Sequence, residues 1–194
     1  MVFDNPILLR TGFGPNLRVG NNPDAQGLWV GYYTYNNPFL MRQYRELGEL
    51  AYCSEQARLA RGWILSHPAR FANLCLRRFV FFWIGTPGFA LGPIRTYVLG
   101  ITAIKTTLFL MSWGGLWIAI KRYVCGAFLF ATLLAFYPLV YYITFPQSRY
   151  RHPIEPELLI LAVFCAATGL ALLQRRRRAH GLPEPAERSQ AASI

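Results

Sequence analysis

A short charged stretch, Ser148-Arg149-Tyr150-Arg151-His152-Pro153-Ile154-Glu155-Pro156, separates two long apolar runs. One run covers Tyr123 to Phe145, and the other covers Leu158 to Leu173. Apolar runs of this length indicate helices that cross a membrane. Arginine, histidine and glutamate at the mouth of such helices are costly unless they have a partner, so the stretch predicts a functional site.

The composition of the whole chain points in the same direction. Its 194 residues are 54% hydrophobic, and the mean hydropathy of +0.25 is too high for an ordinary soluble domain. No carboxylate side chain occurs between Glu55 and Glu155. The sequence therefore predicts an all-α integral membrane protein.

Charge and cysteine content narrow the kinds of ligand. A formal net charge of +11 suits nucleic acid, anionic lipid or phosphate. Because the chain has apolar runs and no nucleic-acid-binding motif, we expect membrane lipid and phosphate rather than nucleic acid. The four cysteines are scattered without a C-x-x-C pair, so we expect no metal site, no cofactor and no disulfide framework. A single Cys53–Cys75 disulfide is the alternative.

Residues 1–93 are predicted to form an N-terminal region outside the membrane, made of helices and short loops. Its first part, residues 1–38, is rich in turn-forming Gly, Asn and Pro, with Ile7-Leu8-Leu9 as a candidate strand. Gly12-Phe13-Gly14 is not expected to open a helix, so it carries no weight as a dinucleotide-binding motif.

Two helices are predicted in the rest of this region. The first covers residues 39–66, with an apolar face at spacings of four, three and four residues: Leu40, Tyr44, Leu47 and Ala51. It ends at His67-Pro68, because proline disfavours helical geometry in the residue before it. The second runs from Pro68 to the turn at Gly85, and its apolar part is too short for a bilayer core of ~30 Å. We expect it to be an amphipathic helix at the membrane interface.

Three spanning helices are predicted within residues 94–174, at about residues 97–120, 123–145 and 156–173. Lys105 lies in the first, where snorkelling to the interface is favoured over a buried role. Gly114-Gly115 and Pro138 are positions for close helix packing or a kink. The basic tail, residues 175–194, is expected to be disordered.

The distribution of basic residues predicts the orientation. One side of the membrane holds six of them, Lys121, Arg122 and Arg175 to Arg178, against Arg95, Arg149 and Arg151 on the other. The C-terminus is therefore expected in the cytoplasm and residues 1–93 outside. No signal peptide precedes this polar region, so we expect the chain to be the C-terminal part of a longer protein.

Read in order, several segments resemble the C-terminal region of bacterial GT-C membrane glycosyltransferases, closest to family 39 and the ArnT-like set related to the dolichyl-phosphate-mannose protein mannosyltransferases. The matching segments are Val2-Phe3, Leu8–Gly14, Val19–Asn22, Tyr44, Gly48-Glu49, Trp63-Ile64, His67-Pro68, Phe71, Arg77-Arg78, Phe82-Trp83, Tyr141–Thr144 and Arg149–Pro156. The arginine-histidine-proline block is the most specific of them.

The resemblance implies a bacterial inner-membrane enzyme that transfers a sugar from a polyprenyl-phosphate carrier to an acceptor on the outer face. Such enzymes use an acidic residue in their first extracytoplasmic loop, and this chain has no segment matching that loop. Asp4 and Asp24 do not follow a first spanning helix, so the catalytic residues are unknown. The chain is therefore expected to be a fragment or subunit of a hexosyl- or pentosyltransferase, with the missing N-terminal half or a partner subunit supplying the acid.

The candidate site binds the carrier phosphate. Arg149 and Arg151 have the charge and planar geometry for bidentate bonds to phosphate, and in a strand-like segment they would share one face. His152 would donate a hydrogen bond or a proton, and Glu155 would hold an arginine in place. The full candidate set is Arg149, Tyr150, Arg151, His152, Glu155, Arg77 and Arg78. Simple anchoring of these arginines to lipid headgroups is the alternative.

Two other functions stay open. The chain could be a non-catalytic membrane protein that binds anionic lipid or a partner glycosyltransferase. A small transporter subunit is a weaker candidate, since the predicted spans show little internal repeat and few polar residues.

Overall fold

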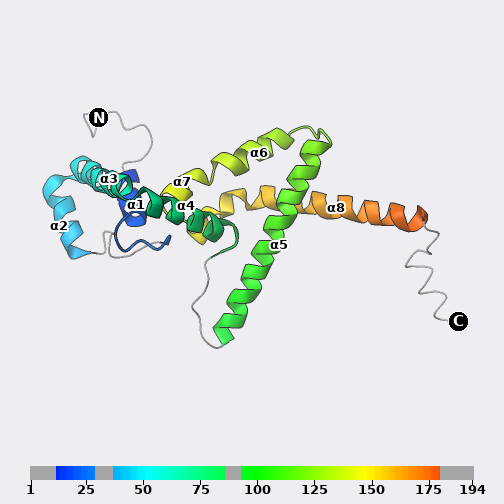
Figure 1. The fold of residues 1–194 in the computed structure, drawn as a ribbon, viewed down its shortest axis with the longest axis horizontal. Coiled ribbons are helices and arrows are strands. Elements are labelled where there is room, and N and C mark those ends of the chain that lie inside the picture. The colour runs from blue at the N-terminus through cyan, green and yellow to red at the C-terminus, as the bar shows by residue number, and fades with distance from the viewer. Residues whose placement is uncertain (1–11, 29–36, 86–92, 180–194) are drawn as a thin grey trace.

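A computed structural model describes residues 12–28, 37–85 and 93–179, and every regular element in these ranges is a helix (Figure 1). The elements in chain order are α1 (Phe13–Gly20), α2 (Pro38–Leu47), α3 (Glu49–Ser66), α4 (Pro68–Trp83), α5 (Pro93–Lys121), α6 (Ala127–Phe136), α7 (Leu139–Ile143), the 3-10 helices η2 (Ser148–Tyr150) and η3 (His152–Ile154), and α8 (Glu155–Ala179). The all-helical prediction is confirmed for these ranges. The candidate strand Ile7–Leu9 lies outside them.

Helix α1 begins where the sequence predicted none. Gly12 is its N-cap, so Gly12-Phe13-Gly14 does open a helix, contrary to expectation. Gly14 is needed for packing, because a Cβ there would overlap the backbone carbonyl of Cys53 on α3. The glycine that looked like a turn former is the point where two helices touch.

The predicted helix over residues 39–66 is present but broken. Gly48 separates α2 from α3. Its φ is 77°, a backbone conformation that residues other than glycine rarely adopt. Helix α2 starts at Pro38 behind an Asn37 cap, whose side-chain oxygen accepts from the Phe39 amide at 3.0 Å. The predicted break at His67-Pro68 is confirmed, since α3 ends at Ser66 and α4 begins at Pro68.

Helix α4 ends just before Gly85, as predicted, and its last residues form the centre of the molecule. Phe82 and Trp83 are buried in a core with residues of α5, α6, η3 and α8. The Trp83 ring lies 5.3 Å from the Phe109 ring and 6.0 Å from the Trp113 ring, both on α5. Its indole N–H donates to the Tyr142 hydroxyl at 2.6 Å. One face of α4 is thus packed against the rest of the fold.

Among the residues that the structure describes, two helices, rather than the predicted three, are long and apolar enough to cross a membrane: Val98–Lys121 and His152–Ala179. The run between them is broken into α6 and α7 at Pro138, which has no amide hydrogen to continue a helix. Its start is also later than predicted, because Tyr123 and Gly126 take positive φ values of 53° and 85° in the connecting turn. The kink expected at Pro138 is therefore confirmed.

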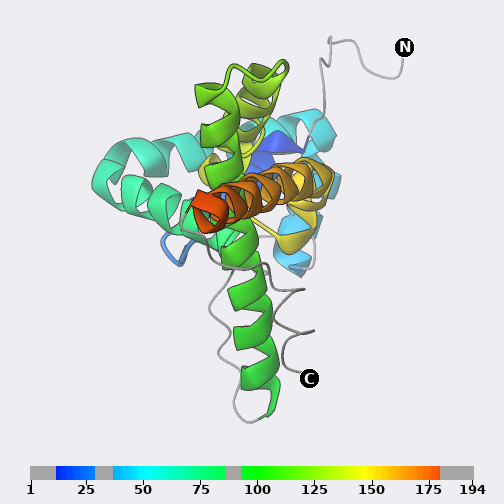
Figure 2. The same cartoon turned by 90° about the vertical axis from the view of Figure 1, so that its right-hand side faces the viewer.

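Helices α5 and α8 pack at one close crossing (Figures 1 and 2). The Ser112 hydroxyl donates to the Leu158 carbonyl at 2.7 Å. A Cβ on Gly115 would overlap the Leu161 carbonyl. The predicted close packing at Gly114-Gly115 is confirmed, since small residues let two backbones approach. Away from the crossing, long apolar faces stay uncovered, as membrane association requires.

Helix α8 extends further than the predicted span. It continues to Ala179, so Arg175 to Arg178 form its last turns rather than the start of a disordered tail. Cations are favourable there because the C-terminal end of a helix carries partial negative charge. Residues 180–194 lie outside the described ranges.

Candidate functional site

The charged stretch is two short 3-10 helices leading into α8, and it is not strand-like. As a result, Arg149 and Arg151 do not share a face. Arg149 is exposed, whereas Arg151 is only 3% exposed. The expectation that both side chains point to one phosphate is wrong, because one residue of 3-10 helix turns the chain by about a third of a turn rather than half.

Arg151 is held by the end of another helix. Its Nη1 donates to the carbonyl of Trp83, the last residue of α4, at 2.6 Å. This carbonyl has no partner inside α4, and the end of a helix attracts a cation. Burial lowers the pKa of Arg151, an effect that the charge of Glu155 partly offsets.

The other edge of the Arg151 guanidinium has no partner among the residues that the structure describes. Nε and Nη2 are buried, and neither makes a hydrogen bond to any of these residues. A buried donor left unsatisfied costs about 1–3 kcal/mol, and more where the group is charged. Nε and Nη2 together form the edge that binds two oxygens of one phosphate or carboxylate. Arg151 therefore has the geometry of an anion-binding group.

Tyr150 packs rather than lining an open site. Its ring stacks on that of Tyr141 at 4.6 Å between centroids. Its carbonyl accepts from the Tyr137 hydroxyl at 2.9 Å. The exposed Arg149 guanidinium lies 5.3 Å from the centroid of the Tyr150 ring, a cation–π contact at the surface.

Glu155 does not pair with an arginine. Its Oε2 lies 3.0 Å from Nδ1 of His152, and both side chains are partly exposed. Within the described ranges this is the side-chain contact that Glu155 makes. The prediction that Glu155 holds an arginine in place is wrong as a contact, although its charge still favours the cationic form of Arg151.

Arg78 has a structural role that the sequence did not reveal. It is 0% exposed. Nη1 donates to the carbonyls of Tyr142 at 3.0 Å and Ile143 at 2.8 Å, at the C-terminal end of α7. Nη2 donates to the carbonyl of Gly20 at the end of α1, and both nitrogens lie 3.3 Å from the side-chain oxygen of Asn21. Arg78 thus joins three segments.

The same surroundings keep Arg78 away from any ligand. Of its guanidinium nitrogens only Nε makes no hydrogen bond. Burial lowers the pKa of Arg78 to about 10, so the group stays cationic at neutral pH. The donors of both terminal nitrogens of Arg78 are used by the protein's own carbonyls, so we leave Arg78 out of the proposed phosphate site.

Arg77, the next residue, points elsewhere. It is exposed and lines a separate cavity on α4, together with Arg70. The seven predicted residues therefore lie in different surroundings: Arg78 is a buried anchor, Arg151 is buried with two unpartnered donors, Tyr150 packs on Tyr141, Arg77 lines a cavity, and Arg149, His152 and Glu155 lie at the surface. Arg70 was not singled out from the sequence, although its spacing of seven residues from Arg77 puts both on one helix face.

No metal centre is built into the described part of the chain, which holds no group of three His, Cys, Asp or Glu side chains able to bind an ion. Comparison with family models, with curated proteins and with solved structures finds no match for this chain.

Proposed function

We propose that this chain binds the phosphate of a polyprenyl-phosphate sugar carrier at Arg151, as the C-terminal portion of a membrane glycosyltransferase. The observation that carries the proposal is the buried, unpartnered Nε–Nη2 edge of Arg151. A site that keeps such an edge open loses stability unless an anion fills it. Arg149 at the adjacent surface would attract the anion first.

The surroundings of Arg151 suit a lipid that carries a phosphate. The carbonyl that holds Arg151 belongs to Trp83, whose ring packs against Phe109 and Trp113 of α5. Trp113 is partly exposed on this apolar helix. An isoprenoid chain would lie along α5 with its phosphate at Arg151. In this arrangement α5, the broken pair α6–α7 and α8 are the three membrane segments, and the C-terminus is cytoplasmic.

Catalysis would need a carboxylate from outside this chain. Glu155 is paired with His152 at the surface, and Glu157 lies within α8. The chain's own part is to bind the carrier and to orient its phosphate. The proposed enzyme is complete only with an acid supplied by upstream sequence or by a partner subunit.

Binding of the carrier tests the proposal directly. The full chain in lipid nanodiscs would be titrated with a polyprenyl phosphate, with the polyprenol that lacks the phosphate as the matched control. We expect at least ~10-fold tighter binding of the phosphate, the range for one charge-assisted bidentate contact. Equal binding of the two would overturn the proposal.

A second candidate is a non-catalytic protein that binds anionic lipid. It is favoured by the exposed Arg149 at one end of the candidate span His152–Ala179 and by Arg175 to Arg178 at the other. Basic residues next to a span are attracted to anionic headgroups. Under this function phosphatidylglycerol would compete with the polyprenyl phosphate at equal affinity.

A further inference from the structure

The cavity on α4 is separate from Arg151 and has a polar rim over an apolar floor. Its volume is about 460 Å³, and its polar lining residues are Gln26, Arg70, Asn73 and Arg77. Ala25 and Leu74, each 3% exposed, form the floor with Trp63 beneath them. Small-molecule sites of a few hundred Å³ commonly combine such a floor with a few polar groups.

The rim is cationic without a carboxylate among its lining residues. Arg70 is oriented: its Nη2 donates to the Pro23 carbonyl at 2.5 Å, and its Cζ lies 5.7 Å from the Trp63 ring centroid. Arg77 makes neither a hydrogen bond nor an ion pair within the described ranges. One arginine is therefore fixed and the other is available.

The wall opposite α4, formed by Ala25 and Gln26, is held in place by hydrogen bonds within its own segment. The Asn22 side chain donates to the carbonyls of Arg18 at 3.0 Å and Val19 at 2.9 Å, and its oxygen accepts from the Asp24 amide at 2.9 Å. The Ala25 amide donates to the Asn22 carbonyl at 3.1 Å. These bonds set the position of Ala25 and Gln26 before any ligand arrives, which lowers the ordering cost of binding.

Gly27 brings this wall close to the stem of Arg77. Its φ is 96°, and a Cβ there would lie 3.3 Å from Cβ of Arg77 and 3.2 Å from the Phe81 ring. The segment that carries Ala25 and Gln26 is thereby packed directly against α4, and Gln26 and Arg77 line the same cavity.

We propose that this cavity binds a phosphate group attached to a hydroxyl-bearing polyol or sugar. The guanidinium groups of Arg70 and Arg77 suit the phosphate oxygens. The amides of Gln26 and Asn73 both donate and accept, which suits hydroxyl groups. The ligand is a free phosphorylated polyol or the same chemistry displayed as a lipid headgroup.

The test uses the full chain in detergent with sn-glycerol 3-phosphate, and then vesicles of phosphatidylcholine with and without phosphatidylglycerol. Arg77→Ala is the variant, because the described residues give Arg77 no hydrogen bond or ion pair and alanine keeps the Cβ that lies beside Gly27. Arg61→Ala, an exposed arginine of α3 outside the cavity, is the matched control. We expect Arg77→Ala to weaken binding about 10-fold and Arg61→Ala to leave it unchanged.

If Arg77→Ala weakens the binding of glycerol 3-phosphate, the ligand is a free phosphorylated polyol. If it weakens only the binding to phosphatidylglycerol vesicles, the ligand is a lipid headgroup. Binding no stronger than that of glycerol or of phosphatidylcholine alone would overturn the proposal, as would an equal loss in both variants. Asn73→Ala should weaken glycerol 3-phosphate more than inorganic phosphate. Equal weakening of the two would contradict the role given to the amides.

Discussion

Arg78 and Arg151 are both buried, and both donate to carbonyls at the ends of helices, yet they differ in how many of their donors are used. Arg78 bonds to three backbone carbonyls and to the Asn21 side chain. Arg151 bonds to one carbonyl and leaves two buried donors unused. Arg78 thus leaves one buried donor, Nε, without a partner, and Arg151 leaves two, Nε and Nη2, which are the two donors that we propose an anion binds.

The comparison also explains how the chain manages without carboxylates over a long interval. Between Glu55 and Glu155 the counter-groups of the buried cations are the last carbonyls of α1, α4 and α7. Such carbonyls have no partner within their own helix and carry partial negative charge. Helix ends therefore do here what acidic side chains do in most soluble proteins.

Arg78→Met should have the largest effect on stability. The substitution keeps the apolar stem but orphans the carbonyls of Gly20 and Tyr142 in a buried place, and it leaves the Ile143 carbonyl with only its bond from the Asn21 side chain. We expect a loss of about 3 kcal/mol or more, measured by denaturant or thermal unfolding. Arg77→Met, the exposed neighbour, should change stability by less than about 0.5 kcal/mol. Similar values for both variants would contradict the anchoring role of Arg78.

Gly20→Ala should break the same anchor without touching the guanidinium. A Cβ on Gly20 would overlap the Thr144 carbonyl and lie 3.3 Å from Nη2 of Arg78. We expect a loss of about 1–3 kcal/mol, the range for overpacking. Gly62→Ala, in the open on α3, should be neutral or stabilising because alanine is the better helix former. A neutral Gly20→Ala would show that α1 and α7 do not touch there.

Arg151→Met should cost far less than Arg78→Met. It orphans one carbonyl, that of Trp83, and it removes two unsatisfied buried donors. We expect a loss of about 1 kcal/mol or less in the absence of ligand, because replacing an underpartnered buried charge by an apolar side chain is often nearly neutral. A loss as large as that of Arg78→Met would mean that the edge is already satisfied.

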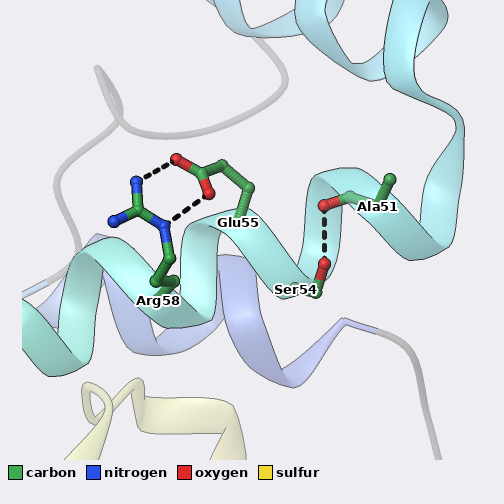
Figure 3. Close-up of polar contacts among 4 residues, drawn as sticks. All are labelled: Ala51, Ser54, Glu55 and Arg58. Atoms are coloured by element: carbon green, nitrogen blue, oxygen red, sulfur yellow. Dashed lines mark hydrogen bonds and ion pairs between the residues drawn. The ribbon is translucent and has the colours of Figure 1, made fainter.

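The exposed pair Glu55–Arg58 should give the smallest loss of stability in this comparison (Figure 3). Both guanidinium contacts to the carboxylate are 2.7 Å long, yet the side chains lie in solvent. Glu55→Gln should leave the Tm unchanged within error, since water and salt screen such pairs. The hydrogen bond from Arg58 lowers the pKa of Glu55. Any stability that Glu55 contributes is therefore fully present above its pKa in the unfolded chain, and it is lost as the pH falls through its lower pKa in the folded protein.

The helical architecture was largely predictable because it follows local rules. The break at His67-Pro68, the end of α4 before Gly85 and the kink at Pro138 all come from residues that disfavour helical geometry in any context. Gly14 and Gly48 were harder. Their roles are a close approach and a positive φ, and a sequence shows only that glycine is present.

The arrangement of the candidate site could not be predicted from the sequence. Arg151 was singled out because charged residues lie beside apolar runs, and in the structure two of its buried donors have no partner among the described residues. The burial of Arg78 could not be foreseen, because its main partners are backbone carbonyls from positions 58 to 65 residues away. Backbone partners leave no mark in a sequence until the helix ends are placed.

The most direct test of the account is the affinity of Arg151→Lys for a polyprenyl phosphate in nanodiscs, with unfolding measured on the same sample. Lysine keeps the charge and removes the two-donor edge. The account predicts about 10-fold weaker binding with helical content retained. Unchanged binding by a folded Arg151→Lys protein would contradict the claim that this edge holds the phosphate.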